Sequence, residues 1–232
     1  MKVFTAVAAA CAVSAALMAP AQAQDKAKAP AAKKAAGAPM TFFVTSTGKG
    51  NGADLGGLEG ADAHCNALAA AAGSKLTTWK AYLSTTMPGG EAGVNARDRI
   101  GKGPWQNVKG VVVAKSVDDL HTANVKINKE TALTEKGGVV PSGGSDGSNT
   151  HDMLTGSDPM GMYSTAGGDT NCGNWTKSDG GSTIVGHHNR AGLGKTTRHM
   201  QSWNSAHGSR GCSPDQLKGS GGAGQFYCFA GQ

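Results

Sequence analysis

The stretch that most constrains the fold is a cysteine-bearing helix that leads into a strand. Apolar residues recur at steps of three and four from Leu58 to Ala72 and include Cys65, so they share one face of a helix that can pack against a core. Gly73 follows where a glycine commonly ends a helix. Residues 77–84 then alternate with period two in residue types that favour a strand. The sequence therefore predicts a helix followed by a strand, with Cys65 on the buried face.

The first 39 residues have the pattern of an export signal and a tether. Residues 1–23 carry one early lysine and an alanine-rich apolar run, and they end in Ala21-Gln22-Ala23, which is typical of a cleavage site. The apolar run is shorter than the about 20 residues that a membrane span needs, so we interpret the segment as a signal peptide rather than a transmembrane anchor. Residues 24–39 consist mainly of Ala, Lys and Pro and cannot form a core. We expect one folded domain over residues 40–232.

The cysteines indicate an oxidising compartment. One of the five, Cys11, lies within the signal, and four remain after cleavage: Cys65, Cys172, Cys212 and Cys228. An even number in an exported chain predicts two disulfides, for which three pairings are possible. We therefore expect a periplasmic, secreted or cell-surface protein, with a lipid anchor at Cys11 as the alternative.

The positive charge does not indicate a nucleic-acid partner. The chain has a formal charge of +6, but Lys2 and the four lysines of residues 24–39 account for most of it. The domain is nearly neutral and shows no basic stripe with interleaved aromatic residues, which phosphate binding would require. The four tryptophans, in a chain with 5% aromatic residues, are expected to anchor the core of the domain.

Four segments occur in the order and with the residue types of one fold family. They are the helix–strand unit GADAHCNALAAAAGSKLTTWKAYLS, the segment TGSDPMG at 155–161, the motif Cys172-x-x-Trp175, and the pair Cys212 and Cys228 with its closing strand. Together they resemble the C-type lectin-like fold, and within it the endostatin domain and a related family of exported bacterial domains of uncharacterised function.

The resemblance implies an α+β domain with small antiparallel sheets, one main helix, a short second helix and a long glycine-rich loop. A capping pair formed by Ser116 and Asp119 would open the short helix. The resemblance also implies two nested disulfides, Cys65–Cys228 and Cys172–Cys212. The outer bridge would close most of the domain into one loop, which removes roughly 5 kcal/mol of unfolded-state freedom in the chain-entropy model.

Calcium-dependent sugar binding does not carry over from the resemblance. Sugar-binding C-type lectins use Glu-Pro-Asn or Gln-Pro-Asp with Trp-Asn-Asp to hold calcium and sugar, and neither motif occurs here. Asp146, Asp152 and Asp158 are nevertheless possible calcium ligands, because carboxylates on a flexible loop suit that ion. The alternative is that they are solvated loop acids.

Two further patterns are interpreted without assigning chemistry to them. His187, His188, His199 and His207 lie close in sequence, but zinc needs ligands that converge tetrahedrally and adjacent histidines rarely do so. We interpret them as surface or loop-packing residues, with a metal site as the alternative. Residues 143–147 match the hydrolase motif G-x-S-x-G, but no predicted strand or helix flanks the serine. The sequence therefore predicts no catalytic residue.

The leading hypothesis is an exported, non-catalytic binding module that recognises a glycan or an envelope or extracellular protein. The long polar stretch from residue 137 to about 199, with the turn at 203–204, has no periodicity that packing would explain. We expect the ligand there, at side chains that suit polar ligands: Asn149, Asp152, Asp158, Asn174, Asn189, Trp203 and Asn204. The alternatives are a structural envelope domain, or a hydrolase or metal-dependent enzyme that uses the glycine-rich loop.

Overall fold

The structure is a computed structural model in which the chain divides into two units, Met1–Ala35 and Ala36–Gln232. It describes Met1 and residues 39–86, 93–165, 167–192 and 198–231. The predicted signal peptide and tether, except for Met1 and Pro39, lie outside the described residues. No helix in the described ranges is both long enough and apolar enough to cross a membrane.

The second unit is a mixed α+β fold whose elements are short apart from one helix and one strand. Its strands are β1 Phe42–Val44, β2 Trp79–Ala81, β3 Trp105–Gln106, β4 Val112–Ala114, β5 Asp152–Leu154, β6 Ile184–His187, β7 His207–Gly208 and β8 Gly222–Ala230. Its helices are α1 Gly57–Ala71, α2 Ala96–Arg99, α3 Val117–Leu120, α4 Cys172–Trp175 and α5 Pro214–Ser220, with 3₁₀ turns η2 Gly144–Asp146 and η3 Arg198–Gln201. The described part of the chain thus has more helices than the one main helix and one short helix that were predicted.

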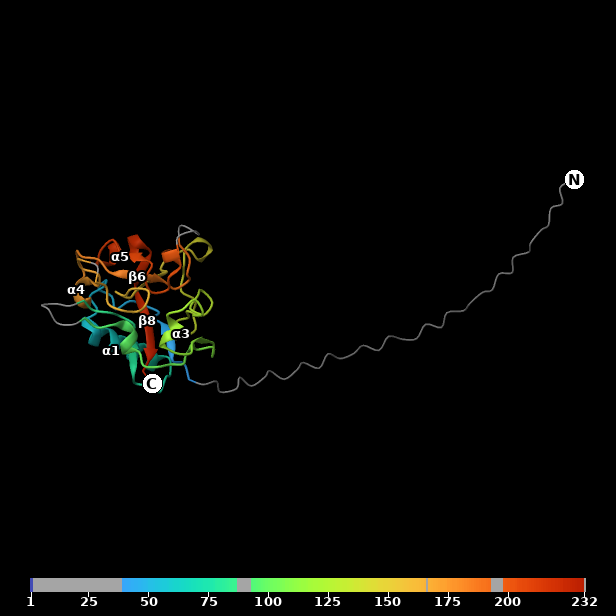
Figure 1. The fold of residues 1–232 in the computed structure, drawn as a ribbon, viewed down its shortest axis with the longest axis horizontal. Helices are drawn as coiled ribbons and strands as arrows, with labels where there is room; N and C mark the ends of the chain where they lie inside the picture. The colour runs from blue at the N-terminus through green and yellow to red at the C-terminus, as the bar shows by residue number, and fades with distance from the viewer. Residues whose placement is uncertain (2–38, 87–92, 166, 193–197, 232) are drawn as a thin grey trace. The chain divides into compact units, whose positions relative to one another are not determined.

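The long strand β8 organises the main sheet. β1 and β2 pair antiparallel with its last residues, and β5 pairs parallel with its first ones. β6 and β7 continue the sheet beyond β5, and β3 and β4 form a separate pair. Figure 1 shows β8 running through the domain between α1 and α3. The prediction that the closing strand pairs near the first strand is confirmed, whereas the β5–β8 pair shows that the sheets are not purely antiparallel.

Both faces of β8 are buried. Phe226, Cys228 and Ala230 belong to the core on the α1 side of the sheet, whereas Tyr227 and Phe229 belong to the core that includes residues of α2 and α3. Successive side chains of a strand point to opposite faces, so the apolar run at the end of the sequence is what a strand with a core on each side requires.

The central helix follows the prediction closely. It ends at Ala71, and Gly73 at φ +86° lets the backbone N–H groups of Gly73 and Ser74 bond back to the carbonyls of Ala70 and Ala69, the usual glycine-terminated helix end. The buried stripe differs at its last position, because Ala69 is buried whereas Ala72 is exposed. The following strand β2 covers only Trp79–Ala81 of the predicted residues 77–84.

The two disulfides join Cys65 to Cys228 and Cys172 to Cys212, which confirms the pairing that the resemblance implied. The first ties α1 to β8, and the second ties α4 to the segment before α5. The predicted cap of the short helix is also present, because the Ser116 hydroxyl accepts a hydrogen bond from the Asp119 N–H.

The sequence interpretation missed several elements, among them β5, β6 and α5. β5 lies inside the stretch that was predicted to be a loop, and β6 lies in the same polar region; strands of three or four residues are too short to show periodicity. α5 had a readable signal. Ser213 and Gln216 form a capping box around Pro214 at the first helical turn, a pattern typical of helix starts.

Candidate functional site

The neighbouring strands β5, β6 and β7 bring three histidines and one aspartate together. Asp152, the first residue of β5, lies directly opposite His187, the last residue of β6. His207, the first residue of β7, pairs with Val185, two residues before His187. His151 immediately precedes β5. Side chains that are opposite or diagonal across paired strands lie within reach of one another, so the pairing register places these four groups at one end of the sheet.

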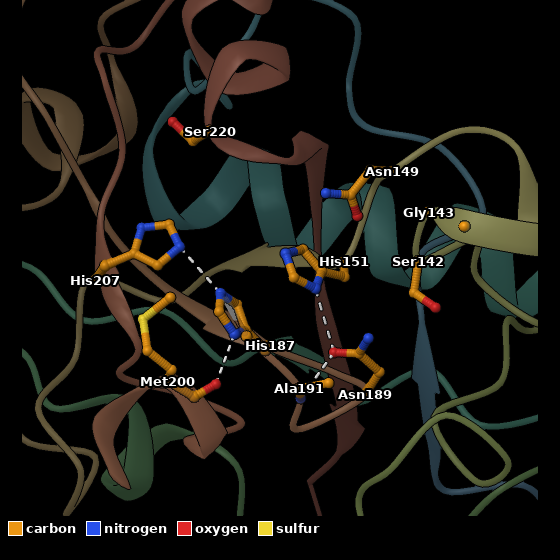
Figure 2. Close-up of a pocket in the computed structure, with 12 residues that line it drawn as sticks. Ser142, Gly143, Asn149, His151, His187, Asn189, Ala191, Met200, His207 and Ser220 are labelled. Carbon is orange, nitrogen blue, oxygen red and sulfur yellow. Dashed lines mark hydrogen bonds between the residues drawn. The ribbon is translucent and has the colours of Figure 1, made fainter. Parts of the chain in front are cut away.

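Each of the three histidines places its Nε2 atom near the same oxygen of Asp152. Nε2 of His151 and Nε2 of His187 each lie 3.2 Å from Asp152 Oδ1. Nε2 of His207 lies 3.6 Å from the same oxygen and 2.9 Å from His187 Nε2. Figure 2 shows the three imidazole rings side by side in the pocket. We call these four residues the histidine–aspartate cluster.

The far nitrogen of each ring contacts an oxygen. Nδ1 lies 3.3 Å from Asn189 Oδ1 in His151, 2.7 Å from the Met200 carbonyl in His187, and 3.0 Å from the Gly208 carbonyl in His207. These oxygens accept hydrogen bonds, so Nδ1 is the nitrogen that carries the proton in each ring. In the neutral imidazole this leaves Nε2 unprotonated and directed into the cluster, so the 2.9 Å contact between Nε2 of His187 and Nε2 of His207 requires a proton on one of them or a cation between them.

Asp152 is a buried charge. Its side chain is 1% exposed, and within the described residues neither carboxylate oxygen has a partner with hydrogen-bond geometry. Burial raises the pKa of Asp152, but the adjacent His187 and His207 lower it by more, so the pKa lies below its usual value and the group is ionised. The Asp152 carboxylate in turn raises the pKa of His207. Both shifts show that the cluster favours a positive charge beside Asp152.

The remaining two histidines of the sequence pattern lie elsewhere. His188 is fully buried, and neither of its ring nitrogens has a partner among the described residues; burial lowers its pKa to about 4. His199 is exposed and borders a different cavity, with Trp203 and Asn204. The interpretation of all four histidines as surface or loop-packing residues was therefore wrong for His187 and His207, because the paired strands β6 and β7 direct their side chains into the cluster.

A pocket of about 380 Å³ opens beside the cluster. Its walls come from the turn before β5, from the turn after β6, from strand β7 itself and from the end of α5. Figure 2 shows that the walls carry mainly polar groups. The polar side chains that line it are Ser142, Asn149, His151, His187, Asn189, His207 and Ser220.

The structure gathers three of the seven predicted ligand-binding residues at this pocket. Asn149 and Asn189 line it, and Asp152 lies in the cluster beside it. Asn174 lies in α4, where its side-chain oxygen accepts a hydrogen bond from the Thr86 N–H at 3.0 Å.

The other three predicted residues surround Tyr82. The Asn204 amide, 1% exposed, donates to the Tyr82 hydroxyl at 3.0 Å and to the Asp158 carbonyl at 3.1 Å. The Trp203 ring, 4% exposed, packs on the Tyr82 ring at 4.8 Å. Trp79, Trp105 and Trp175 are fully buried, so the prediction that the tryptophans anchor the core is confirmed.

The three predicted calcium ligands have different surroundings. Asp146 pairs with Lys129 at 2.7 Å and with Ser142. Asp158 accepts hydrogen bonds from the N–H groups of Met160 and Met162. Within the described ranges, only Asp152 belongs to a group of convergent metal-ligand atoms.

The sequence interpretation did not identify His151 as a functional residue. Its only signal was the dipeptide His151-Asp152 directly before the apolar Met153 and Leu154, which places two potential ligands at a strand start. The partners across the sheet cannot be read from that local pattern.

Comparison of the chain with protein-family models and with curated proteins finds no match.

Gly186, one residue before His187, allows the chain segment that leads to β7 to pass close to β6. A Cβ atom at this position would lie 1.9 Å from the Trp203 carbonyl oxygen, a backbone atom that no side-chain rotation can move. We expect Gly186→Ala to lower the free energy of unfolding by about 1–3 kcal/mol through overpacking. Urea denaturation checks this, with Gly167→Ala as the control because a Cβ there meets no atom within 4 Å. Equal denaturation midpoints for the two variants would contradict the close approach.

Proposed function

We propose that the domain is an exported binding module that takes a polar ligand in the pocket beside the histidine–aspartate cluster. The observation that carries this proposal is the pocket itself, in which hydrogen-bonding side chains from four separate segments face one space of about 380 Å³. Pockets of a few hundred Å³ with a small number of placed polar groups are typical of small-molecule sites. Within this class, a glycan is the ligand that we favour over a polar group of an envelope or extracellular protein.

A sugar suits the pocket because its hydroxyl groups both donate and accept hydrogen bonds. The Asn149 side chain is exposed in the pocket and has no hydrogen-bond partner among residues that the structure describes, so its amide offers both a donor and an acceptor. The NH₂ group of Asn189 is a further donor, since its oxygen is already engaged by His151 and by the Ala191 N–H.

The surroundings of the cluster favour binding over hydrolysis. A serine or cysteine nucleophile needs a histidine base within hydrogen-bond distance. In the described part of the chain, the ring nitrogens of His151, His187 and His207 contact an amide oxygen, main-chain carbonyls, Asp152 and one another. Ser142 instead donates to Asp146, and Ser145 stands in the exposed 3₁₀ turn η2.

A glycan array with the purified protein tests the proposal, followed by titration of the best ligand against two variants. Asn149→Ala is expected to weaken binding by up to about tenfold, which corresponds to the loss of one or two hydrogen bonds. Asn124→Ala is the matched control, because Asn124 is an equally exposed asparagine that does not line the pocket. Glycan binding that is unchanged by Asn149→Ala, or equally weakened by the control, would contradict this placement.

A further inference from the structure

We propose that His151, Asp152, His187 and His207 bind one divalent transition-metal ion, for which zinc is the best match. This inference goes beyond ligand recognition, because the cluster can hold a metal whether or not the pocket takes a glycan. It rests on the spacing of the four ligand atoms, on the tautomers of the three rings and on the buried carboxylate.

The spacing agrees with tetrahedral coordination. Zinc bonds of about 2.0–2.1 Å to nitrogen and oxygen place neighbouring ligand atoms of a tetrahedron about 3.3–3.4 Å apart. Four of the six distances among the four ligand atoms are 2.9, 3.2, 3.2 and 3.6 Å. His151, Asp152 and His187 place their three ligand atoms within 4.8 Å of one another, and His207 adds contacts to Asp152 and His187 from the next strand.

Each ring also has a hydrogen bond at its far nitrogen, as metal-binding histidines do, and the stacked His151 and His187 rings, with centroids 4.2 Å apart and an interplanar angle of 14°, turn apart when both bind one ion. Metal-binding histidines almost always donate their other ring N–H to a carbonyl, carboxylate or water oxygen. Here the acceptors are Asn189 Oδ1 and the carbonyls of Met200 and Gly208. Two of the three are main-chain atoms, so the strands and turns themselves fix the rings.

The Asp152 carboxylate provides an independent observation. A carboxylate that is 1% exposed and lacks hydrogen bonds is costly to bury unless a positive charge compensates it. Neutral imidazoles at 3.2 Å do not supply that charge, whereas a metal ion among them, or a proton on one of the rings, does. The rival explanation is a shared proton among the imidazoles, and the experiment below separates the two.

The ligand types select the metal. Three imidazole nitrogens and one carboxylate oxygen suit zinc, copper or nickel, whereas calcium and magnesium prefer sites made only of oxygen. A tetrahedral arrangement favours zinc among the former. The ion has an entry path from the pocket, because the His207 and His151 side chains are 27% and 14% exposed.

Calorimetric titration of the chelator-treated protein with zinc chloride tests the proposal, with calcium chloride as the comparison. We expect one zinc per chain, no calcium binding at the cluster, and a melting temperature raised by about 5–10 °C at a free zinc concentration about 100 times the Kd. His151→Ala and His207→Ala should each weaken zinc binding more than about 100-fold, and Asn189→Ala, which removes the acceptor of His151 without removing a metal ligand, by about 10–100-fold. His199→Ala, a nearby exposed histidine outside the cluster, should change nothing.

Zinc binding that is absent, or that survives both histidine variants, would overturn the proposal in favour of a proton-sharing cluster. If those variants fail to fold, the cobalt(II) form of the unaltered protein decides: the intense visible bands of tetrahedral cobalt support the site, and a weak octahedral spectrum overturns it. The glycan titration is repeated on chelator-treated protein. Because the pocket can bind a glycan with or without zinc in the cluster, the failure of one proposal does not decide the other.

Discussion

Replacing Cys65 and Cys228 together by alanine is expected to lower the free energy of unfolding by about 2–5 kcal/mol. The bridge joins residues 163 positions apart, and a loop of that length restricts the unfolded chain by about 5 kcal/mol in the chain-entropy model. It also fixes the central helix α1 to β8, the strand on which β1, β2 and β5 pair. Denaturation in urea without reductant measures the change.

The second bridge is the matched control for this prediction. Cys172 and Cys212 are 40 positions apart and, like the first pair, fully buried. The same model gives about 4 kcal/mol for the shorter loop. The Cys172→Ala/Cys212→Ala variant should therefore lose less stability than the Cys65→Ala/Cys228→Ala variant. The reverse order would contradict the view that the outer bridge is the main constraint on the domain.

Trp175→Ala is expected to destabilise the protein by about 3–5 kcal/mol, the usual range for removing a buried tryptophan. The ring is fully buried, and its Nε1–H donates to the Ser84 carbonyl at 2.8 Å. It packs directly on Gly156, where a Cβ atom would lie 2.8 Å from the ring. The substitution leaves a cavity and removes the shorter of the two side-chain hydrogen bonds to the Ser84 carbonyl, which keeps only the Asn171 amide at 3.4 Å.

Trp175→Phe separates these two contributions, because it keeps an aromatic ring and removes the hydrogen bond. We expect it to cost clearly less than Trp175→Ala, with unfolding followed by urea denaturation for both. A loss below about 1 kcal/mol for Trp175→Ala would show that this tryptophan is not the anchor its burial indicates.

The parts of the fold that could be predicted are those with a signal within a few neighbouring residues. The helix around Cys65 has the 3.6-residue period, Gly73 ends it, and Ser116 caps the next short helix. The disulfide pairing was predicted from the resemblance to a known fold, because the spacing of the four cysteines alone leaves three possible pairings. The strands β5 and β6 lack such a signal because they are held by their neighbours rather than by their own pattern.

The candidate site was predicted only in part for the same reason. Asn149, Asp152 and Asn189 stood out as polar residues in a stretch without periodicity, and the structure places the two asparagines in the lining of one pocket and Asp152 in the cluster beside it. The adjacent histidines diverge as expected, because His187 enters the cluster and His188 does not. The cluster residue that the sequence did not single out, His151, immediately precedes β5, and only the pairing register between β5 and β6 brings it beside His187.

Anomalous diffraction at the zinc edge, from crystals grown with zinc chloride, locates a bound ion directly. We expect one anomalous peak among β5, β6 and β7, about 2.0–2.1 Å from Nε2 of His151, His187 and His207 and from one oxygen of Asp152. No peak at this place under saturating zinc, or a peak only at His199 or another surface histidine, would contradict a metal site built from this cluster.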